Sequence, residues 1–244
     1  MSSEESSNDF TDNYQVYLAG GLFSQHDLSA NVSLKEAVWR LSKGRFELVL
    51  PQSKELRQLD TPNLAAYLRN EDVKQAIQAD ILLARFDGAE LDSGMIVEFM
   101  IAKMLGKPSV IIRTDSRHLT TEGLDDPFNL MVKNWPRTQV VYTDALIDYT
   151  QRIAAARESL HDADSGGQFL EAEIQIIQKS TDALAEKVIE ALNAVIEIES
   201  PYPPELREAL YEAVRYTPGA GFDQLLPEDR LKSTLAKLRK HKTL

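Results

Sequence analysis

The sequence predicts an α/β protein in which a doubly wound sheet of five parallel strands is followed by an α-helical C-terminal extension. Between residues 14 and 144, short apolar runs alternate with amphipathic stretches, which is the pattern of strands connected by helices. After Asp144, apolar residues recur at helical spacings of three and four. We therefore expect an α/β domain at 14–144 and a helical extension at 145–244 that serves packing or oligomerisation.

The first elements follow from local signals. An apolar run at 16–19 predicts the first strand, which ends at a Gly-Gly turn. A helix follows, with Ser33 and Glu36 as its capping box and Gly44 as its end. The second strand is expected at 46–50, and the proline after it stops the strand.

The rest of this domain continues the alternation. We expect short helices that start at Thr61 and Asn70, a strand at 81–86, a helix at about 94–106, and strands at 108–113 and 138–142. This succession indicates a flavodoxin-like sheet, in which the ligand binds beyond the carboxyl ends of the strands. Four polar side chains should then lie near one crevice, namely Tyr17, Gln52, Asp92 and Glu98.

The extension is expected to contain a helix from about residue 146 to 160, a longer one from about 170 to 195 with nearly heptad spacing, and helices at 204–215 and 227–240. The last of these is basic and amphipathic. Such a helix can contact an anionic membrane or nucleic acid, but a helix docked on the protein with a solvated basic face is favoured.

Composition excludes several classes of function. The net charge of −11 argues against a broad surface for nucleic acid. There is no cysteine, so disulfides, thiolate catalysis and cysteine-based zinc sites are excluded, and the four histidines show no metal-ligand spacing. Residues 1–13 are expected to be a disordered acidic arm, unlike a signal peptide. No apolar run approaches the roughly 18 residues of a membrane span, so a cytoplasmic protein is expected.

Glu98 is the first candidate for chemistry. It is the one charged residue in the mostly apolar run 93–102, and an ionised carboxylate is costly to bury without partners. The alternative is a glutamate on the wet face of an amphipathic helix. Asp72 and Asp92 are expected around the same crevice, and paired carboxylates suit cleavage at an anomeric carbon. The sequence has no Walker A motif, no Gly-x-Gly-x-x-Gly after the first strand, and no Ser–His or Cys–His arrangement.

Four segments carry a resemblance to a known family. They are Val16–Phe23 with its Gly-Gly turn, Asn70-Glu71-Asp72 followed by Ala79-Asp80-Ile81, Asp92-Ser93-Gly94-x-x-x-Glu98 with Gly106-Lys107-Pro108 downstream, and Asn129-Leu130-Met131. In this order and spacing, over about residues 14–142, the chain resembles the nucleoside 2-deoxyribosyltransferases. Short family members end soon after the fifth strand, so the extension is a departure from the family pattern.

The resemblance implies a transferase of nucleotide salvage that exchanges the base of 2′-deoxyribonucleosides, with no cofactor and no metal. Glu98 would be the nucleophile and Tyr17 would hold it in place. Asp72 and Asp92 would contact base and sugar, and one of them would help to protonate the departing base. The residues implied in substrate binding are Gln52, Gly20, Phe23, Asn129 and Met131, the last two from a neighbouring subunit. A homo-oligomer with shared active sites is therefore expected, without nucleic acid or membrane as partner.

Simpler interpretations exist for the same residues. Asp92 also fits a helix N-cap and Asp72 an exposed first-turn residue. Gln52, Asn129 and Met131 also fit ordinary loop or core positions. Two other functions remain open. One is an N-glycosidase that hydrolyses a deoxynucleoside or its monophosphate, and the other is a nucleotide-sensing module without catalysis.

Overall fold

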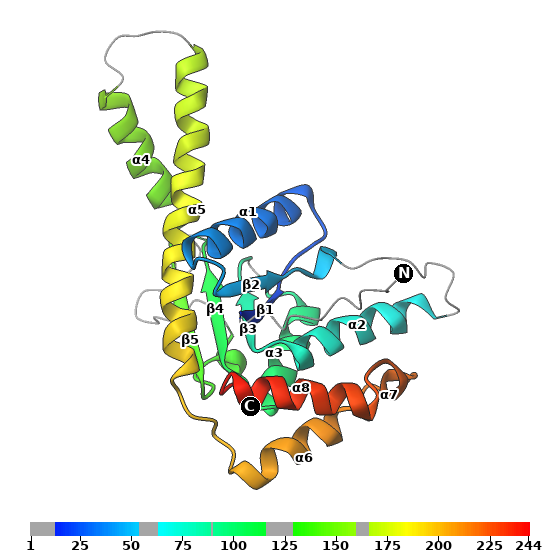
Figure 1. Ribbon diagram of the computed structural model, residues 1–244. Helices are drawn as coiled ribbons and strands as arrows, with labels where there is room; N and C mark the ends of the chain where they lie inside the picture. The colour runs from blue at the N-terminus through cyan, green and yellow to red at the C-terminus, as the bar shows by residue number, and fades with distance from the viewer. Residues whose placement is uncertain (1–12, 54–62, 89, 116–128, 160–165) are drawn as a thin grey trace, which may run out of the picture.

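The computed structural model describes residues 13–53, 63–88, 90–115, 129–159 and 166–244. In these residues one parallel sheet has the strand order β2-β1-β3-β4-β5 (Figure 1). Its strands are β1 (Tyr14–Ala19), β2 (Phe46–Val49), β3 (Ile81–Arg85), β4 (Ser109–Arg113) and β5 (Thr138–Tyr142). This is the order of a flavodoxin-like doubly wound sheet. The predicted fold class is confirmed.

Helices cover both faces of the sheet and form the C-terminal extension. They are α1 (Gln25–Leu41), η1 (Pro51–Ser53), α2 (Leu64–Gln78), α3 (Ser93–Met104), η3 (Leu130–Val132), α4 (Ala145–Ser159), α5 (Gly166–Ile196), α6 (Pro204–Val214), α7 (Phe222–Leu225) and α8 (Glu228–Lys240). The sequence did not predict the short helix α7.

The start of α1 was predicted wrongly. The capping box is formed by Ser24 and Asp27, not by Ser33 and Glu36, since the Ser24 side chain accepts from the Asp27 N–H and the Asp27 carboxylate accepts from the Ser24 N–H. The helix therefore begins two turns earlier than expected. Ser33 lies inside it and donates its hydroxyl to the Ser29 carbonyl (2.9 Å).

The two short helices expected after the second strand are one continuous helix, α2, which Asn63 caps through the Ala66 N–H (3.1 Å). Asn70 does not start a helix, because it lies in the middle of α2 and donates to the Ala220 carbonyl (3.1 Å). Thr61 and residues 1–12 of the predicted acidic arm lie outside the described residues. Asn13 is buried and donates to Glu47 (3.0 Å), so the predicted arm does not include it.

The two faces of the sheet support different layers, because successive residues of a strand point to opposite sides. Val16 and Leu18 point to a core shared with α1 and with the second half of α5, which contributes Val188. Tyr17 and Ala19 point to the other face, which α2 and α3 cover. The extension therefore supplies part of the cover of one sheet face.

A further layer lies outside α2. Leu231, Leu235 and Leu238 of α8 are buried there against Ile77 of α2 and Tyr211 of α6. The interpretation of the basic C-terminal helix as a docked helix is confirmed, since its leucines face the core.

The first half of α5 has a different environment. With α4 it forms a hairpin that projects from the sheet (Figure 1). Leu170, Ile174 and Ile177, which belong to the heptad-like pattern, are each more than half exposed on it. Within the described ranges, no helix is long and apolar enough to cross a bilayer.

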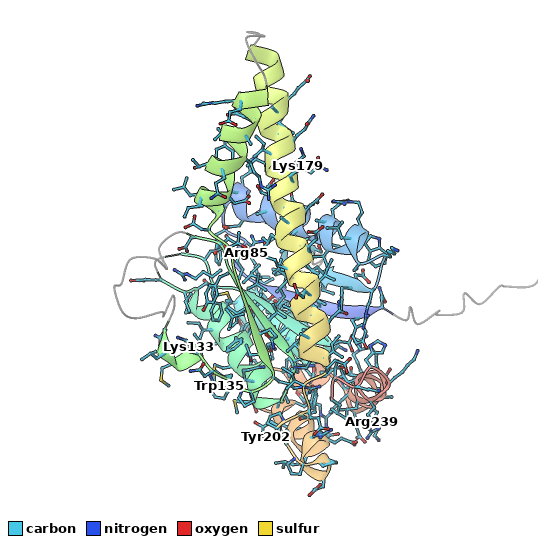
Figure 2. The ribbon with its side chains drawn as sticks, turned by 90° about the vertical axis from the view of Figure 1, so that its left-hand side faces the viewer. Arg85, Lys133, Trp135, Lys179, Tyr202 and Arg239 are labelled. Atoms are coloured by element: carbon cyan, nitrogen blue, oxygen red, sulfur yellow. The ribbon has the colours of Figure 1, made fainter. Side chains whose placement is uncertain are left out.

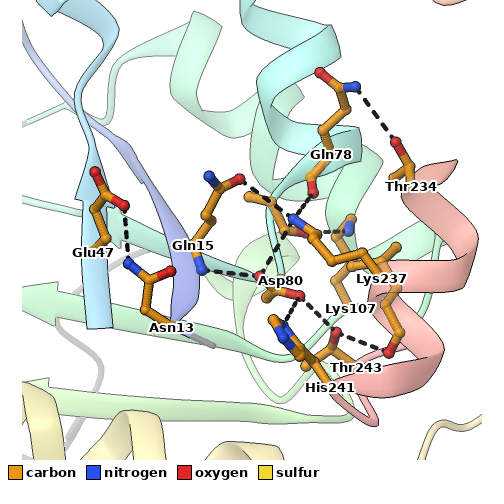
Figure 3. A network of polar contacts seen from close by, with 12 residues as sticks. Asn13, Gln15, Glu47, Gln78, Asp80, Lys107, Thr234, Lys237, His241 and Thr243 are labelled. Atoms are coloured by element: carbon orange, nitrogen blue, oxygen red, sulfur yellow. Dashed lines mark hydrogen bonds and ion pairs between the residues drawn. The ribbon is translucent and has the colours of Figure 1, made fainter. Parts of the chain in front are cut away.

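The end of the chain is held at the amino edge of the sheet by buried Asp80 (Figure 3). Its carboxylate accepts from the Gln15 N–H (2.9 Å) and from the Thr243 hydroxyl (3.3 Å), and it lies 2.9 Å from His241 Nδ1. Lys237 Nζ lies 3.4 Å away. The guanidinium of Arg137 adds contacts to the carbonyls of Gly106, Ile198, Lys242 and Thr243. These contacts join the extension to β3 and β5.

Candidate active site

A tyrosine and two carboxylates from three different elements meet on the α2/α3 face of the sheet. The Tyr17 hydroxyl oxygen, from β1, lies 2.9 Å from Glu98 Oε1 of α3 and 3.1 Å from Asp72 Oδ1 of α2. The Tyr17 side chain is fully buried, whereas Glu98 and Asp72 are half-buried. The structure thus brings together three of the four predicted catalytic residues.

Packing on α3 explains the position of Glu98. Met95, Phe99 and Ala102 point into the core beneath the helix. Glu98 precedes Phe99 on the helix and therefore lies at the margin of this buried stripe. Asp72 lies on α2 one helical turn before Ala76, which is buried in the same core. Each carboxylate thus lies where a helix leaves the core, within reach of the Tyr17 hydroxyl.

Tyr17 keeps its proton in this environment. Burial raises the pKa of the Tyr17 hydroxyl far above its usual value, and the charge of Glu98 and the hydrogen bond to it raise this pKa further. The single O–H proton can be donated to only one carboxylate at a time. The Tyr17 hydroxyl is thus a donor shared between Glu98 Oε1 at 2.9 Å and Asp72 Oδ1 at 3.1 Å.

Asp92, the fourth predicted catalytic residue, is the N-cap of α3. Its Oδ1 accepts from the Met95 N–H at 2.9 Å. This contact fits the simpler interpretation of Asp92, because a capping oxygen satisfies one of the free N–H groups at a helix start. Asp92 also fixes where α3 begins and hence where Glu98 lies.

The predicted substrate-binding residues lie in several environments. Both ends of the Gln52 amide are bound by α1, since Oε1 accepts from Asn31 (3.0 Å) and Nε2 donates to the Leu28 carbonyl (3.0 Å). Gly20 packs tightly on β3, where an added Cβ would lie 3.2 Å from the Arg85 Cβ. Phe23 is 80% exposed in the turn after β1.

Asn129 and Met131 lie apart from this turn, at the exposed start of η3. The Asn129 side chain accepts from the Met131 N–H (2.9 Å), and Met131 is 77% exposed. The neighbouring Leu130 is exposed as well.

Sequence reasoning missed Asn31, which is fully buried and links the turn after β1 to the end of β2. Its Nδ2 donates to the Gly21 carbonyl (3.1 Å) and to Gln52 Oε1 (3.0 Å). A signal existed, because Asn31 falls at helical spacing with buried Leu34 and Val38. A polar residue on a core-facing stripe marks a specific hydrogen-bonding role. Among the described residues, no cluster of three or more His, Asp or Glu side chains is placed to hold a metal ion.

Comparisons with known proteins indicate the family of the α/β domain. Residues 16–131 match the family model "Nucleoside 2-deoxyribosyltransferase", and the match contains Tyr17, Asp72, Asp92 and Glu98. The α/β domain belongs to this family. The match ends before α4, so the nucleoside 2-deoxyribosyltransferase model leaves all the helices of the extension outside it.

Three bacterial proteins are among the solved structures similar to this chain. A conserved protein from Enterococcus faecalis V583 is 28% identical, with 57% of this chain and 99% of that one covered and a TM-score of 0.44. A 2-deoxyribosyltransferase from Bacillus psychrosaccharolyticus is 18% identical, with 53% and 85% covered and a TM-score of 0.41. A CMP N-glycosidase from Clostridium botulinum is 13% identical, with 58% and 98% covered and a TM-score of 0.35. A comparison with curated proteins gave no match.

Proposed function

We propose that the protein is a nucleoside 2-deoxyribosyltransferase that exchanges the base of 2′-deoxyribonucleosides through a covalent deoxyribosyl-glutamate intermediate. The observation that carries the proposal is the contact of Tyr17 with Glu98 and Asp72 on one side of the sheet. A held carboxylate next to a second one is what nucleophilic displacement at an anomeric carbon requires.

Glu98 is the nucleophile. Tyr17 binds its Oε1, which orients Oε2 for attack on C1′ of the deoxynucleoside. The new C1′–O ester bond forms as the C1′–N bond breaks, and the electron pair of that bond leaves with the base. A second base then attacks C1′, and the Glu98 carboxylate is released. Two inversions give net retention.

Asp72 is the acid that protonates the departing base. When it carries a proton, it donates to the Tyr17 oxygen while Tyr17 donates to Glu98, so all three groups are satisfied. The proposal assigns the two roles to separate carboxylates, with Glu98 as the nucleophile and Asp72 as the acid, which is the division of roles that glycosyl transfer needs. The incoming base returns its proton to Asp72.

The other predicted residues complete the pocket. Asp92 contacts the substrate in addition to capping α3. Gly20, Phe23 and Gln52 lie on or beside the turn that faces the substrate. Asn129 and Met131 complete the site of a neighbouring copy. The exposure of Leu130 and Met131 supports this role, because these side chains lose solvent contact in an oligomer.

A base-exchange assay tests the proposal. Deoxyinosine and adenine are incubated with the protein, and deoxyadenosine and hypoxanthine are expected as products. Replacing the nucleophile in Glu98→Gln should lower turnover by about 10³-fold or more, while Glu186→Gln, at an exposed position of α5, should not change it. A 2-fluoro-sugar nucleoside should add its mass to the peptide that contains Glu98.

Other outcomes would contradict the proposal in distinct ways. Free deoxyribose without a new nucleoside would indicate an N-glycosidase that uses water as acceptor. Binding of nucleosides without any turnover, in both the wild type and Glu98→Gln, would indicate a sensing module.

A further inference from the structure

Arg85, the last residue of β3, lies largely buried on the sheet face opposite Tyr17, at the edge from which the α4–α5 hairpin projects (Figure 2). Its Nε atom is inaccessible and has no hydrogen-bond partner. To the described residues, its guanidinium makes no hydrogen bond and no ion pair. Burial lowers the pKa of Arg85, while the charges of Asp87 and Asp27 act in the opposite direction. A guanidinium in this state is costly to bury.

Two other buried arginines have hydrogen-bond acceptors within the protein. Arg113, at the end of the neighbouring strand, donates to the carbonyls of Phe86 (2.5 Å) and Gly88 (3.1 Å) and pairs with Asp115 (3.2 Å). Arg137 donates to the carbonyls named above. All three guanidinium nitrogens of Arg137 and two of those of Arg113 thus donate to the protein. Arg113 Nε lacks a partner as Arg85 Nε does, but Arg85 differs in that its guanidinium donates to none of the described residues.

The Arg85 side chain lines a pocket of about 580 Å³ between α1, the ends of β3 to β5, α4 and α5. This volume lies within the range of about 300–1,000 Å³ that small-molecule sites occupy. Much of the wall is apolar, with Leu34 from α1, Tyr149 from α4, and Ile177 and Leu184 from α5. Because α4 and α5 supply one side, the extension creates this pocket.

A second polar group in the pocket suits an anion. The Thr143 hydroxyl lines it and accepts from Lys187 Nζ (3.1 Å), so its own proton is available for donation. The carboxylate of Asp148, also in the wall, is occupied by Arg152 (2.8 Å) and Ser180 (2.5 Å). Asp27 and Asp87 near Arg85 reduce the positive potential, which favours a singly charged ligand over a dianion.

We propose that this pocket binds a small monocarboxylate with an apolar body, which is a second ligand site separate from the Glu98 site. The carboxylate accepts from Arg85 and Thr143, and the body lies against Leu34 and Leu184. The two sites lie on opposite faces of the sheet, since Val16 and Leu18 face this side and Tyr17 faces the other. The Arg85 Cβ lies against Gly20 of the turn after β1.

Binding of 1-naphthoate and of the neutral 1-naphthalenemethanol, measured by calorimetry on the full chain, tests the proposal. The acid should bind at least about tenfold more tightly than the alcohol, because a guanidinium–carboxylate pair is charge-assisted. Arg85→Leu should lower the affinity for the acid about tenfold and remove the difference in affinity between acid and alcohol. Arg85→Lys should restore part of that difference. Arg45→Leu, which removes an exposed cation at the amino end of β2, should bind like the wild type.

A second variant covers the case in which Arg85→Leu does not fold. Ala30→Trp narrows the pocket from an exposed position on α1. It should lower the affinity for the acid and for the alcohol by the same factor. Glu98→Gln should bind the acid like the wild type. The proposal is overturned if the wild type does not bind the acid saturably, if Arg85→Leu binds it unchanged, or if Glu98→Gln alone abolishes binding, which would place the probe in the other site.

Discussion

Tyr17→Phe isolates the hydroxyl at the centre of the candidate active site. The ring is fully buried in the core and phenylalanine has the same shape, so the fold should be retained. The change removes a 2.9 Å hydrogen bond to Glu98. A hydrogen bond to a charged group contributes about 1.5–3 kcal/mol. At about 1.4 kcal/mol for each factor of ten, kcat/KM for base exchange should fall about 10- to 150-fold.

The assay pairs kinetics with stability. Base exchange is measured for the wild type, Tyr17→Phe, Glu98→Ala and the double variant, and urea unfolding is measured for the same four proteins. The stability cycle should show a coupling of about 1–3 kcal/mol between the two positions, because they are in direct contact. Full activity in Tyr17→Phe, with no coupling, would refute the view that Tyr17 holds Glu98. Reduced activity in Tyr17→Phe, together with coupling between the two positions in the stability cycle, would support the contact between Tyr17 and Glu98.

Four further predictions concern stability and aggregation. Asp80→Ala removes the buried acceptor of Gln15, His241 and Thr243 and should lower the free energy of unfolding by about 3–5 kcal/mol in urea titrations. Asp182→Ala breaks an exposed ion pair with Arg40 and should cost less than about 1 kcal/mol. Folding raises the pKa of the Tyr17 hydroxyl. The free energy of unfolding therefore includes the full contribution of Tyr17 at neutral pH, and this contribution falls above about pH 10, where Tyr17 of the unfolded chain loses its proton. Tyr17→Phe should therefore show a shallower loss of stability at alkaline pH. A chain that ends at Asp144 lacks α5 and exposes the core face of Val16 and Leu18, so it should aggregate in light-scattering measurements.

Each of these has a contrary result. Equal losses for the two aspartate variants would mean that Asp80 does not anchor the end of the chain. Parallel pH curves for the wild type and Tyr17→Phe would mean that the hydroxyl is not protected from ionisation. A monodisperse chain that ends at Asp144 would show that the extension is dispensable for the core.

The sequence predicted well where the signal is local. The strands at 109–113 and 138–142 are short apolar runs between turn residues, and their bounds differ from the prediction by at most one residue. Glu98 was singled out as the one charge inside an apolar run, and Tyr17 and Asp72 by their expected place near the ends of the strands; their roles came from the resemblance to the family. Each of these features is written in a few consecutive residues.

Cap selection required the tertiary structure. Ser33 and Glu36 have the spacing of a capping box as well as Ser24 and Asp27 do. The choice depends on where α1 meets the sheet, since Asn31, Leu34 and Val38 must all face the interior. In the same way, Asn70 is a good helix start in isolation. In the structure it lies in the middle of α2, where its side chain donates to the carbonyl of Ala220, 150 residues further along the chain.

The sequence by itself thus determined the order of most of the elements, because hydrophobic periodicity acts over short distances along the chain, and its resemblance to a family supplied the candidate catalytic residues. Only the tertiary structure decided that Gln52 is bound by Asn31, that Asp80 holds the C-terminal residues, and that Arg85 lines a pocket built with α4 and α5 without donating to any described residue. These outcomes depend on hydrogen bonds and burial between segments far apart in sequence. A local sequence pattern does not indicate which distant residue a side chain will contact.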